Sequence, residues 1–182
     1  MNKPKDTSEY YLSMDAAVIR PVFQDLRIQA EVISLTKEPT ILPVDCFTLV
    51  KNTCKLCEKT MATALKEATE LLGPYHKVPI YMETIDGRPF ILIPLQSPRS
   101  TVNTWVTLHA IEYHKRSSKD PAYTDIHLTN GEVITVNASF TTFNRQYVLA
   151  NALRTAYIKL QEQRQEDRLL VLSKLAAEPL SK

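Results

Sequence analysis

Residues 123–137, with the sequence YTDIHLTNGEVITVN, indicate the fold class most clearly. Asn130-Gly131 is a dipeptide typical of two-residue β-hairpin turns, and it separates two short runs of strand-forming residues. The apolar side chains on both sides of the turn share one parity and therefore one face: Ile126, Leu128, Ile134 and Val136. We therefore expect an antiparallel hairpin of residues 123–129 and 132–137 with one buried face.

A helical pattern follows the hairpin. Ser139 is a suitable helix N-cap, and neither Gly nor Pro occurs from there to Glu178. Apolar residues recur at helical spacing in the first part: Phe143, Tyr147, Ala150 and Tyr157. Residues 161–168 contain no apolar side chain, so we expect this stretch to bend, fray or bridge to a terminal helix that ends near Ala177.

Upstream of the hairpin, the pattern predicts more strands and one helix. Val102–Tyr113 alternates as a long strand, and Asp86-Gly87 divides Val78–Leu95 into a second hairpin. A helix over residues 52–72 carries a regular apolar stripe and ends at Gly73-Pro74. Short strands are expected within Ala16–Phe23, Ile28–Leu35 and Thr40–Val44.

These elements predict an α+β fold: a single domain of short, mainly antiparallel strands packed with one central helix and a C-terminal helical region. Residues 1–9 form a polar, disordered lead, residues 10–160 the domain, and residues 161–182 a helical tail.

Composition excludes several classes of protein. The 182 residues are 44% hydrophobic and 23% charged, and no run of 18 apolar residues offers a membrane span. The first eight residues lack a secretory signal, so we expect a cytoplasmic protein. The three glycines lie too far apart for a Gly-rich phosphate loop or a nucleophile elbow, which excludes enzymes built on either motif. We expect a protein that is not an enzyme and binds no cofactor.

The cysteines and large aromatic residues have structural interpretations. Cys54-x-x-Cys57 matches half of a zinc site or a redox pair, but both sulfurs continue the apolar stripe of the expected helix, which favours core packing and no metal. We also expect Trp105 and Tyr113 to be buried rather than to stack on a base.

Positive charge is concentrated in the middle of the chain. Residues 46–119 carry 10 basic and 6 acidic groups, against a net charge of +2 for the whole protein. Lys55, Lys59 and Lys66 form a stripe on the expected helix, and His114-Lys115-Arg116 forms a second cluster with Lys119. Both could bind nucleic-acid phosphates. In the alternative interpretation Lys66 pairs with Glu70 and the second cluster lies in an exposed loop after a strand.

Three blocks of sequence resemble the ComK family of competence transcription factors of Gram-positive bacteria. The first contains Thr53-Cys54-Lys55 and His76-Lys77-Val78-Pro79-Ile80. The second contains Pro94, Ser97-Pro98 and Trp105, and the third contains Asn130-Gly131-Glu132, Ser139, Phe143, Gln146 and Leu153-Arg154-Thr155. The likeness extends from about Tyr10 to Tyr157.

This resemblance implies a transcription activator of competence (DNA-uptake) genes that binds double-stranded DNA at paired A/T-rich boxes, through the minor groove, as a homodimer or tetramer. RNA polymerase and a Clp-protease adaptor are the further partners that it implies. On this hypothesis the candidate DNA-binding residues are Lys55, Lys59, Lys66, Lys77, Arg99, Lys115 and Arg116.

The chain also departs from the family pattern. Thr63-Ala64 replaces a common Gly-Arg pair, Asn103 replaces a common Cys, and no aromatic-rich adaptor-binding pattern follows Arg164. Two alternatives therefore stay open. One is a divergent paralogue with weak DNA binding that acts through protein contacts. The other is a thiol or zinc enzyme built on Cys46, Cys54, Cys57 and His76.

Overall fold

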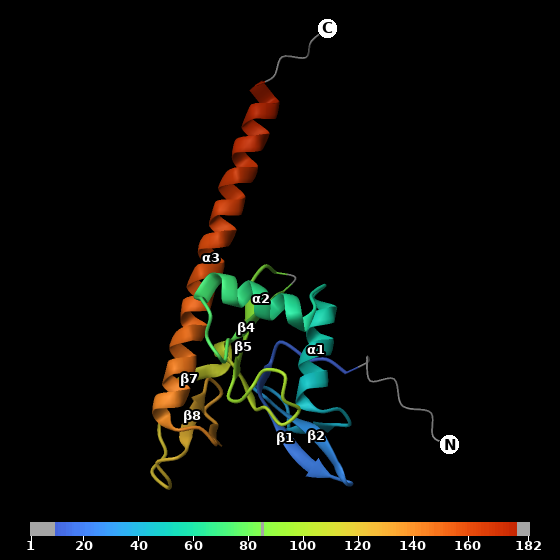
Figure 1. The fold of residues 1–182 in the computed structure, drawn as a ribbon, viewed down its shortest axis with the longest axis vertical. Helices are drawn as coiled ribbons and strands as arrows, with labels where there is room; N and C mark the ends of the chain where they lie inside the picture. Colours follow the sequence, from blue (N-terminus) through green and yellow to red (C-terminus); the bar gives the residue numbers. More distant parts are fainter. Residues whose placement is uncertain (1–9, 85, 178–182) are drawn as a thin grey trace, which may run out of the picture.

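The computed structural model describes residues 10–84 and 86–177, and over these residues it confirms the α+β fold (Figure 1). Two antiparallel sheets pack with three α-helices. The expected disordered lead and the last five residues lie outside the described residues. None of the described helices is long and apolar enough to cross a membrane.

The larger sheet has six strands in the order β3-β2-β1-β6-β5-β4. Their bounds are β1 Ala16–Gln24, β2 Arg27–Ser34, β3 Thr40–Leu42, β4 Ile80–Glu83, β5 Pro89–Pro94 and β6 Trp105–Thr107. The three expected N-terminal strands and the hairpin around Asp86-Gly87 are confirmed.

Each face of this sheet is covered by a separate hydrophobic core. On one face, Ile19, Leu92 and Trp105 pack with Leu49 and Cys54 of the first helix. On the other face, Val18, Ile93 and Val106 pack with Phe143 and Leu153 of the last helix. Adjacent residues of one strand therefore enter different cores, because successive side chains of a strand point to opposite faces.

The expected helix over residues 52–72 is two helices, α1 Cys46–Leu56 and α2 Met61–Leu72, so a single continuous helix is wrong. Glu58, with φ of 56°, takes the chain out of the helical conformation. The Thr60 side chain then accepts a hydrogen bond from the Thr63 backbone N–H (3.0 Å) and caps α2. Asp45 caps α1 in the same way through the Thr48 N–H (2.9 Å).

The long strand expected over Val102–Tyr113 is also interrupted. After β6, a 3₁₀ turn, η2 Leu108–Ala110, carries the chain to β7 Ile111–Arg116 in the second sheet. Thr107 stabilises this transition, because its buried hydroxyl donates to the carbonyl oxygen of Ala16 (2.7 Å). The alternation of the sequence therefore describes two strands in two sheets.

The smaller sheet has the order β7-β8-β9, with β8 Thr124–Leu128 and β9 Val133–Val136. The expected Asn130-Gly131 hairpin is confirmed, and Gly131 has the positive φ (89°) that its turn requires. Ile126, Leu128 and Val136 are buried beneath α3.

The C-terminal helix, α3, is continuous from Phe140 to Ala177. The Ser139 hydroxyl accepts from the Thr142 N–H (3.3 Å), which confirms the expected cap. Of the three alternatives expected for residues 161–168, the structure shows the bridge and not the bend or the fray, because the described helix is continuous through them. Helix α3 continues beyond the body of the protein with exposed side chains (Figure 1).

Candidate nucleic-acid interface

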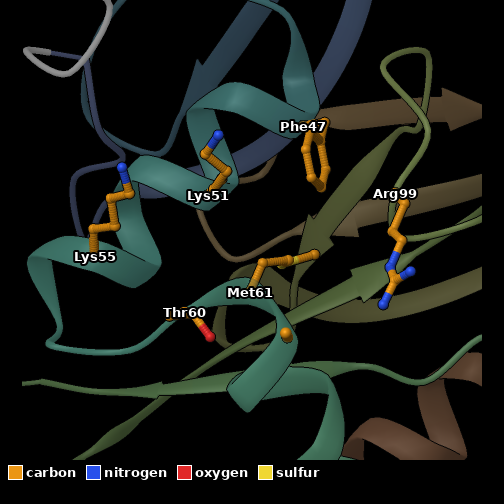
Figure 2. A pocket seen from close by; sticks show the side chains of 7 residues that line it. Phe47, Lys51, Lys55, Thr60, Met61 and Arg99 are labelled. Atoms are coloured by element: carbon orange, nitrogen blue, oxygen red, sulfur yellow. The ribbon is translucent and has the colours of Figure 1, made fainter.

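A cleft of about 390 Å³ lies between α1, the start of α2 and the loop that precedes β6. Figure 2 shows lysines of α1 on one side of it and an arginine of the loop on the other. Its lining residues are Phe47, Lys51, Lys55, Thr60, Met61, Ala62 and Arg99. We call this set the cationic cleft.

Helix α1 positions the two lysines through its periodicity. Phe47, Lys51 and Lys55 are four residues apart and share one face. The opposite face, with Leu49, Val50 and Cys54, is buried in the core. Burial of that face fixes the helix rotation, so Lys51 and Lys55 are directed to the surface.

The loop of residues 95–104 positions Arg99. Asn103 is fully buried, and its side-chain oxygen accepts hydrogen bonds from the backbone N–H groups of Leu95 (3.1 Å) and Gln96 (2.7 Å). Gln96 in turn accepts from the Thr104 N–H (3.0 Å). These bonds close the loop at its base and hold Arg99, which is exposed, opposite α1.

The first turn of α2 adds partial positive charge to the cationic cleft. Backbone N–H groups at a helix N-terminus lack intrahelical partners, and the helix dipole is positive at this end. Thr60, Met61 and Ala62 line the cleft, and this turn carries no acidic residue. The arrangement is suited to an anion such as a phosphate group.

The cations of the cleft are available to a ligand. Among the described residues, ion pairs occupy Arg20, Lys59, Lys66 and Arg88. Within residues 10–84 and 86–177, no ion pair involves Lys51, Lys55 or Arg99. Their charges therefore have no carboxylate partner to displace before they bind a phosphate.

A second cleft, of about 230 Å³, lies between the start of α3 and the segment that follows α2. Its basic residues are His76, Lys77 and Arg145. The Lys77 ammonium donates to the carbonyl oxygen of Leu95 (3.0 Å), so this cleft is tied to the loop that carries Arg99.

The predicted site residues are distributed over several places. The cationic cleft contains Lys55 and Arg99, and the second cleft contains Lys77. Lys59 forms an ion pair with Glu67. The ammonium nitrogen of Lys66 lies 3.8 Å from a carboxylate oxygen of Glu70, which confirms the ion pair expected between these two residues. The expected stripe of three lysines is therefore wrong, because the break between α1 and α2 separates them.

The cluster His114-Lys115-Arg116 is not in a loop, as the alternative interpretation held, but within β7. His114 turns toward α3, where its ring contacts Phe143 and Tyr147. Lys115 and Arg116 are exposed at the edge of the smaller sheet.

Sequence reasoning missed Lys51 and Arg145. Lys51 is one helical turn before Lys55, but the expected helix began at residue 52 and so left it out. Arg145 lies in the first turns of α3, and no local pattern places those turns beside residues 75–77.

Trp105 and Tyr113 differ in their burial. Trp105 is fully buried, as expected. Tyr113 is not: 48% of its surface is exposed, and its ring stacks on His127 with centroids 4.1 Å apart. The expected burial of Tyr113 is wrong because β7 is an edge strand whose outer face has no covering layer.

The cysteines pack in the core as expected, except that Cys57 is only half buried. Burial raises the pKa of the Cys46 thiol to about 12 and that of Cys54 to about 11. Burial also raises the pKa of Cys57, partly offset by the charge of Lys59. The described residues hold no group of three or more His, Cys, Asp or Glu side chains arranged for a metal ion.

Comparison with known proteins assigns the chain to a family. The family model described as ComK protein matches residues 7–164 of the 182-residue chain. The chain therefore belongs to the ComK family, a family of competence-related transcription factors and not of enzymes. Comparisons with curated proteins and with solved structures each found no significant match.

Proposed function

We propose that this protein is a DNA-binding transcription activator of competence genes. It binds paired A/T-rich boxes through the minor groove as a homo-oligomer. The observation that carries this proposal is the cationic cleft, in which Lys51, Lys55 and Arg99 converge on the N-terminus of α2. Membership of the ComK family supports a competence-related transcription factor. The boxes, the minor groove and the homo-oligomer are what the resemblance to this family implies.

Each component of the cleft has a separate role in this mechanism. Lys51 and Lys55 neutralise successive phosphates, and the N–H groups of the first α2 turn bind another phosphate oxygen. Arg99 enters the minor groove, which is narrow and strongly negative in A/T tracts and attracts guanidinium groups. Lys77, Lys115, Arg116 and Lys66 are candidates for flanking phosphate contacts.

Homo-oligomers fit paired boxes because a two-fold protein axis presents the same surface to two half-sites. RNA polymerase and a Clp-protease adaptor remain the proposed protein partners.

Fluorescence anisotropy tests the proposal directly. A labelled duplex with two A/T boxes is compared with a duplex of the same composition in shuffled order. We expect at least a hundredfold preference for the boxes, which is about 2.7 kcal/mol. Equal, weak binding to both duplexes would overturn the proposal and favour a role through protein contacts.

A further inference from the structure

The hairpin of β1 and β2 extends beyond the rest of the larger sheet as a two-stranded ribbon. β1 pairs with β6 only at Val18 and Ile19, and β2 pairs with β3 only from Ala30 to Val32. Residues 22–29 therefore pair only with each other, and we call them the ribbon tip. Figure 1 shows this hairpin reaching away from the helices.

The ribbon tip carries large apolar side chains with high exposure to solvent. Leu26 is 90% exposed, the highest value for a large hydrophobic residue in the described chain, and Phe23 is 75% exposed. Ile28, the cross-strand partner of Phe23, is also exposed. Folded proteins rarely gather large apolar residues on a projecting tip unless a partner covers them.

The turn at the ribbon tip holds Leu26 in a strained backbone conformation. Asp25 and Leu26 both have positive φ, 51° and 59°. A two-residue turn of this kind favours Asn-Gly, because the left-handed conformation is unfavourable for a residue with a Cβ atom. Because the Leu26 side chain is exposed, it gains no packing energy that would offset this strain. This indicates that the side chain contacts another molecule.

The ribbon leaves the body beside the proposed DNA contacts. Arg20 and Pro21, just before the ribbon tip, share a groove with Gln96 and Val102 of the loop that holds Arg99. From Pro21 the strand continues for about five residues at about 3.3 Å each, so Leu26 reaches roughly 15 Å further. This is within the dimensions of one DNA groove and its flanking backbone.

We propose that Leu26 and Phe23 form an apolar wedge that enters the minor groove and partly unstacks one base step, which kinks DNA held along the cationic cleft. This inference rests on the proposed function and adds the mode of contact. Apolar wedges of this kind kink DNA toward the major groove, and T-A steps of A/T-rich sites unstack most easily.

The small size of the ribbon tip favours DNA over a protein partner. Three exposed side chains bury only a few hundred Å², whereas a specific protein interface needs about 1,200 Å² or more. A base step needs only one or two inserted side chains. Arg27 follows Leu26 and has no ion pair among the described residues, so it can bind the phosphate beside the wedge.

The test uses a box duplex labelled at both ends for energy transfer, with 2-aminopurine placed at successive T-A steps. The variants are Leu26→Gly, which suits the positive φ and removes only the side chain, and Phe23→Ser. The matched control is Leu169→Gln, which changes another exposed apolar residue, on the distal part of α3. Thermal unfolding checks that every variant is folded, and we expect Leu26→Gly to be at least as stable as wild type.

We expect wild type to shorten the end-to-end distance and to raise 2-aminopurine fluorescence at one step. Leu26→Gly and Phe23→Ser lose both signals and bind about tenfold more weakly, with an unchanged salt dependence, while Leu169→Gln behaves as wild type. Analytical ultracentrifugation of the same variants measures their self-association. If these variants bend DNA as wild type does, or if they change only the sedimentation coefficient of the protein, the wedge is wrong and the proposed function stands. If wild type binds no duplex, both are wrong.

Discussion

The ammonium nitrogen of Lys59 lies 3.9 Å from the centroid of the Tyr81 ring. The same nitrogen donates to a Glu67 carboxylate oxygen at 2.5 Å, and the Lys59 side chain is only 16% exposed. Lys59 therefore joins the turn between α1 and α2 to α2 and β4. Although it is close to Lys55 in sequence, its contacts assign it a structural role.

Lys59→Met removes the ion pair and the cation–π contact but keeps most of the stem. We expect the free energy of unfolding in urea to fall by about 1–2 kcal/mol, because both contacts are partly shielded from water. Lys66→Met is the control: its pair with Glu70 is mostly exposed, so we expect a loss below about 0.5 kcal/mol. Equal losses in the two variants would contradict this assignment.

The same ion pair predicts a pH dependence. Burial acts to raise the pKa of Glu67, but hydrogen bonds from Lys59 and Tyr81 and the Lys59 charge bring it below its ordinary value. A lowered pKa in the folded state stabilises the protein above the unfolded-state pKa, and this stabilisation is lost as the pH falls through the folded-state pKa. We therefore expect the stability difference between wild type and Lys59→Met to shrink from pH 7 to about pH 3. A constant difference would show that the Glu67 charge is not involved.

Asn103→Ala should loosen the loop that holds Arg99. The substitution leaves the Gln96 N–H without its acceptor, whereas the Leu95 N–H keeps the carbonyl oxygen of Thr104 (3.0 Å). An unsatisfied N–H group costs about 1–3 kcal/mol, so we expect a loss of about this size in urea unfolding. Asn137→Ala, at an exposed asparagine, serves as the control and should change stability by less than about 0.5 kcal/mol. A stable Asn103→Ala protein would mean that the loop does not depend on this side chain.

The thiols should react in a fixed order. Raised pKa values leave little thiolate at pH 8, and the fully buried Cys46 and Cys54 are also shielded from reagents. We expect Cys57 to react slowly with a disulfide reagent in the native protein, and Cys46 and Cys54 to react only on unfolding. Mass spectrometry of partly labelled protein identifies the site. Rapid native labelling of Cys54 would reopen the thiol-enzyme alternative.

Patterns with local causes were predictable from the sequence. The Asn130-Gly131 turn and its apolar face need only turn chemistry and strand parity, and Ser139 caps α3 with its own hydroxyl. The N-terminal strands followed from β-branched residues between prolines.

The break between α1 and α2 and the end of β6 were not predictable, because the local preferences of the residues at these points do not indicate an interruption. Glu58 takes a positive φ although glutamate favours helix, and the apolar spacing from Cys54 to Met61 conceals the break. Likewise Trp105 to Leu108 are all buried, since both faces of the sheet are covered there, so alternation carries no information about where β6 ends.

The candidate site depends mostly on tertiary contacts. Lys55 and Arg99 are 44 positions apart, and only the buried face of α1 and the Asn103 hydrogen bonds bring them to one cleft. Charge counting identified both residues but could not distinguish them from Lys59, whose partners Glu67 and Tyr81 come from two other elements.

The most direct test of the account measures box-duplex affinity by anisotropy over a range of salt concentrations, for wild type and for the triple variant Lys51→Ala, Lys55→Ala, Arg99→Ala. Each lost phosphate contact lowers the slope of log K against log salt by about 0.9. We predict that the slope of the triple variant falls by the amount that corresponds to two to three lost contacts. Lys174→Ala, on the distal part of α3, should keep the wild-type slope. A triple variant with the wild-type affinity and slope would contradict the claim that the cationic cleft binds DNA.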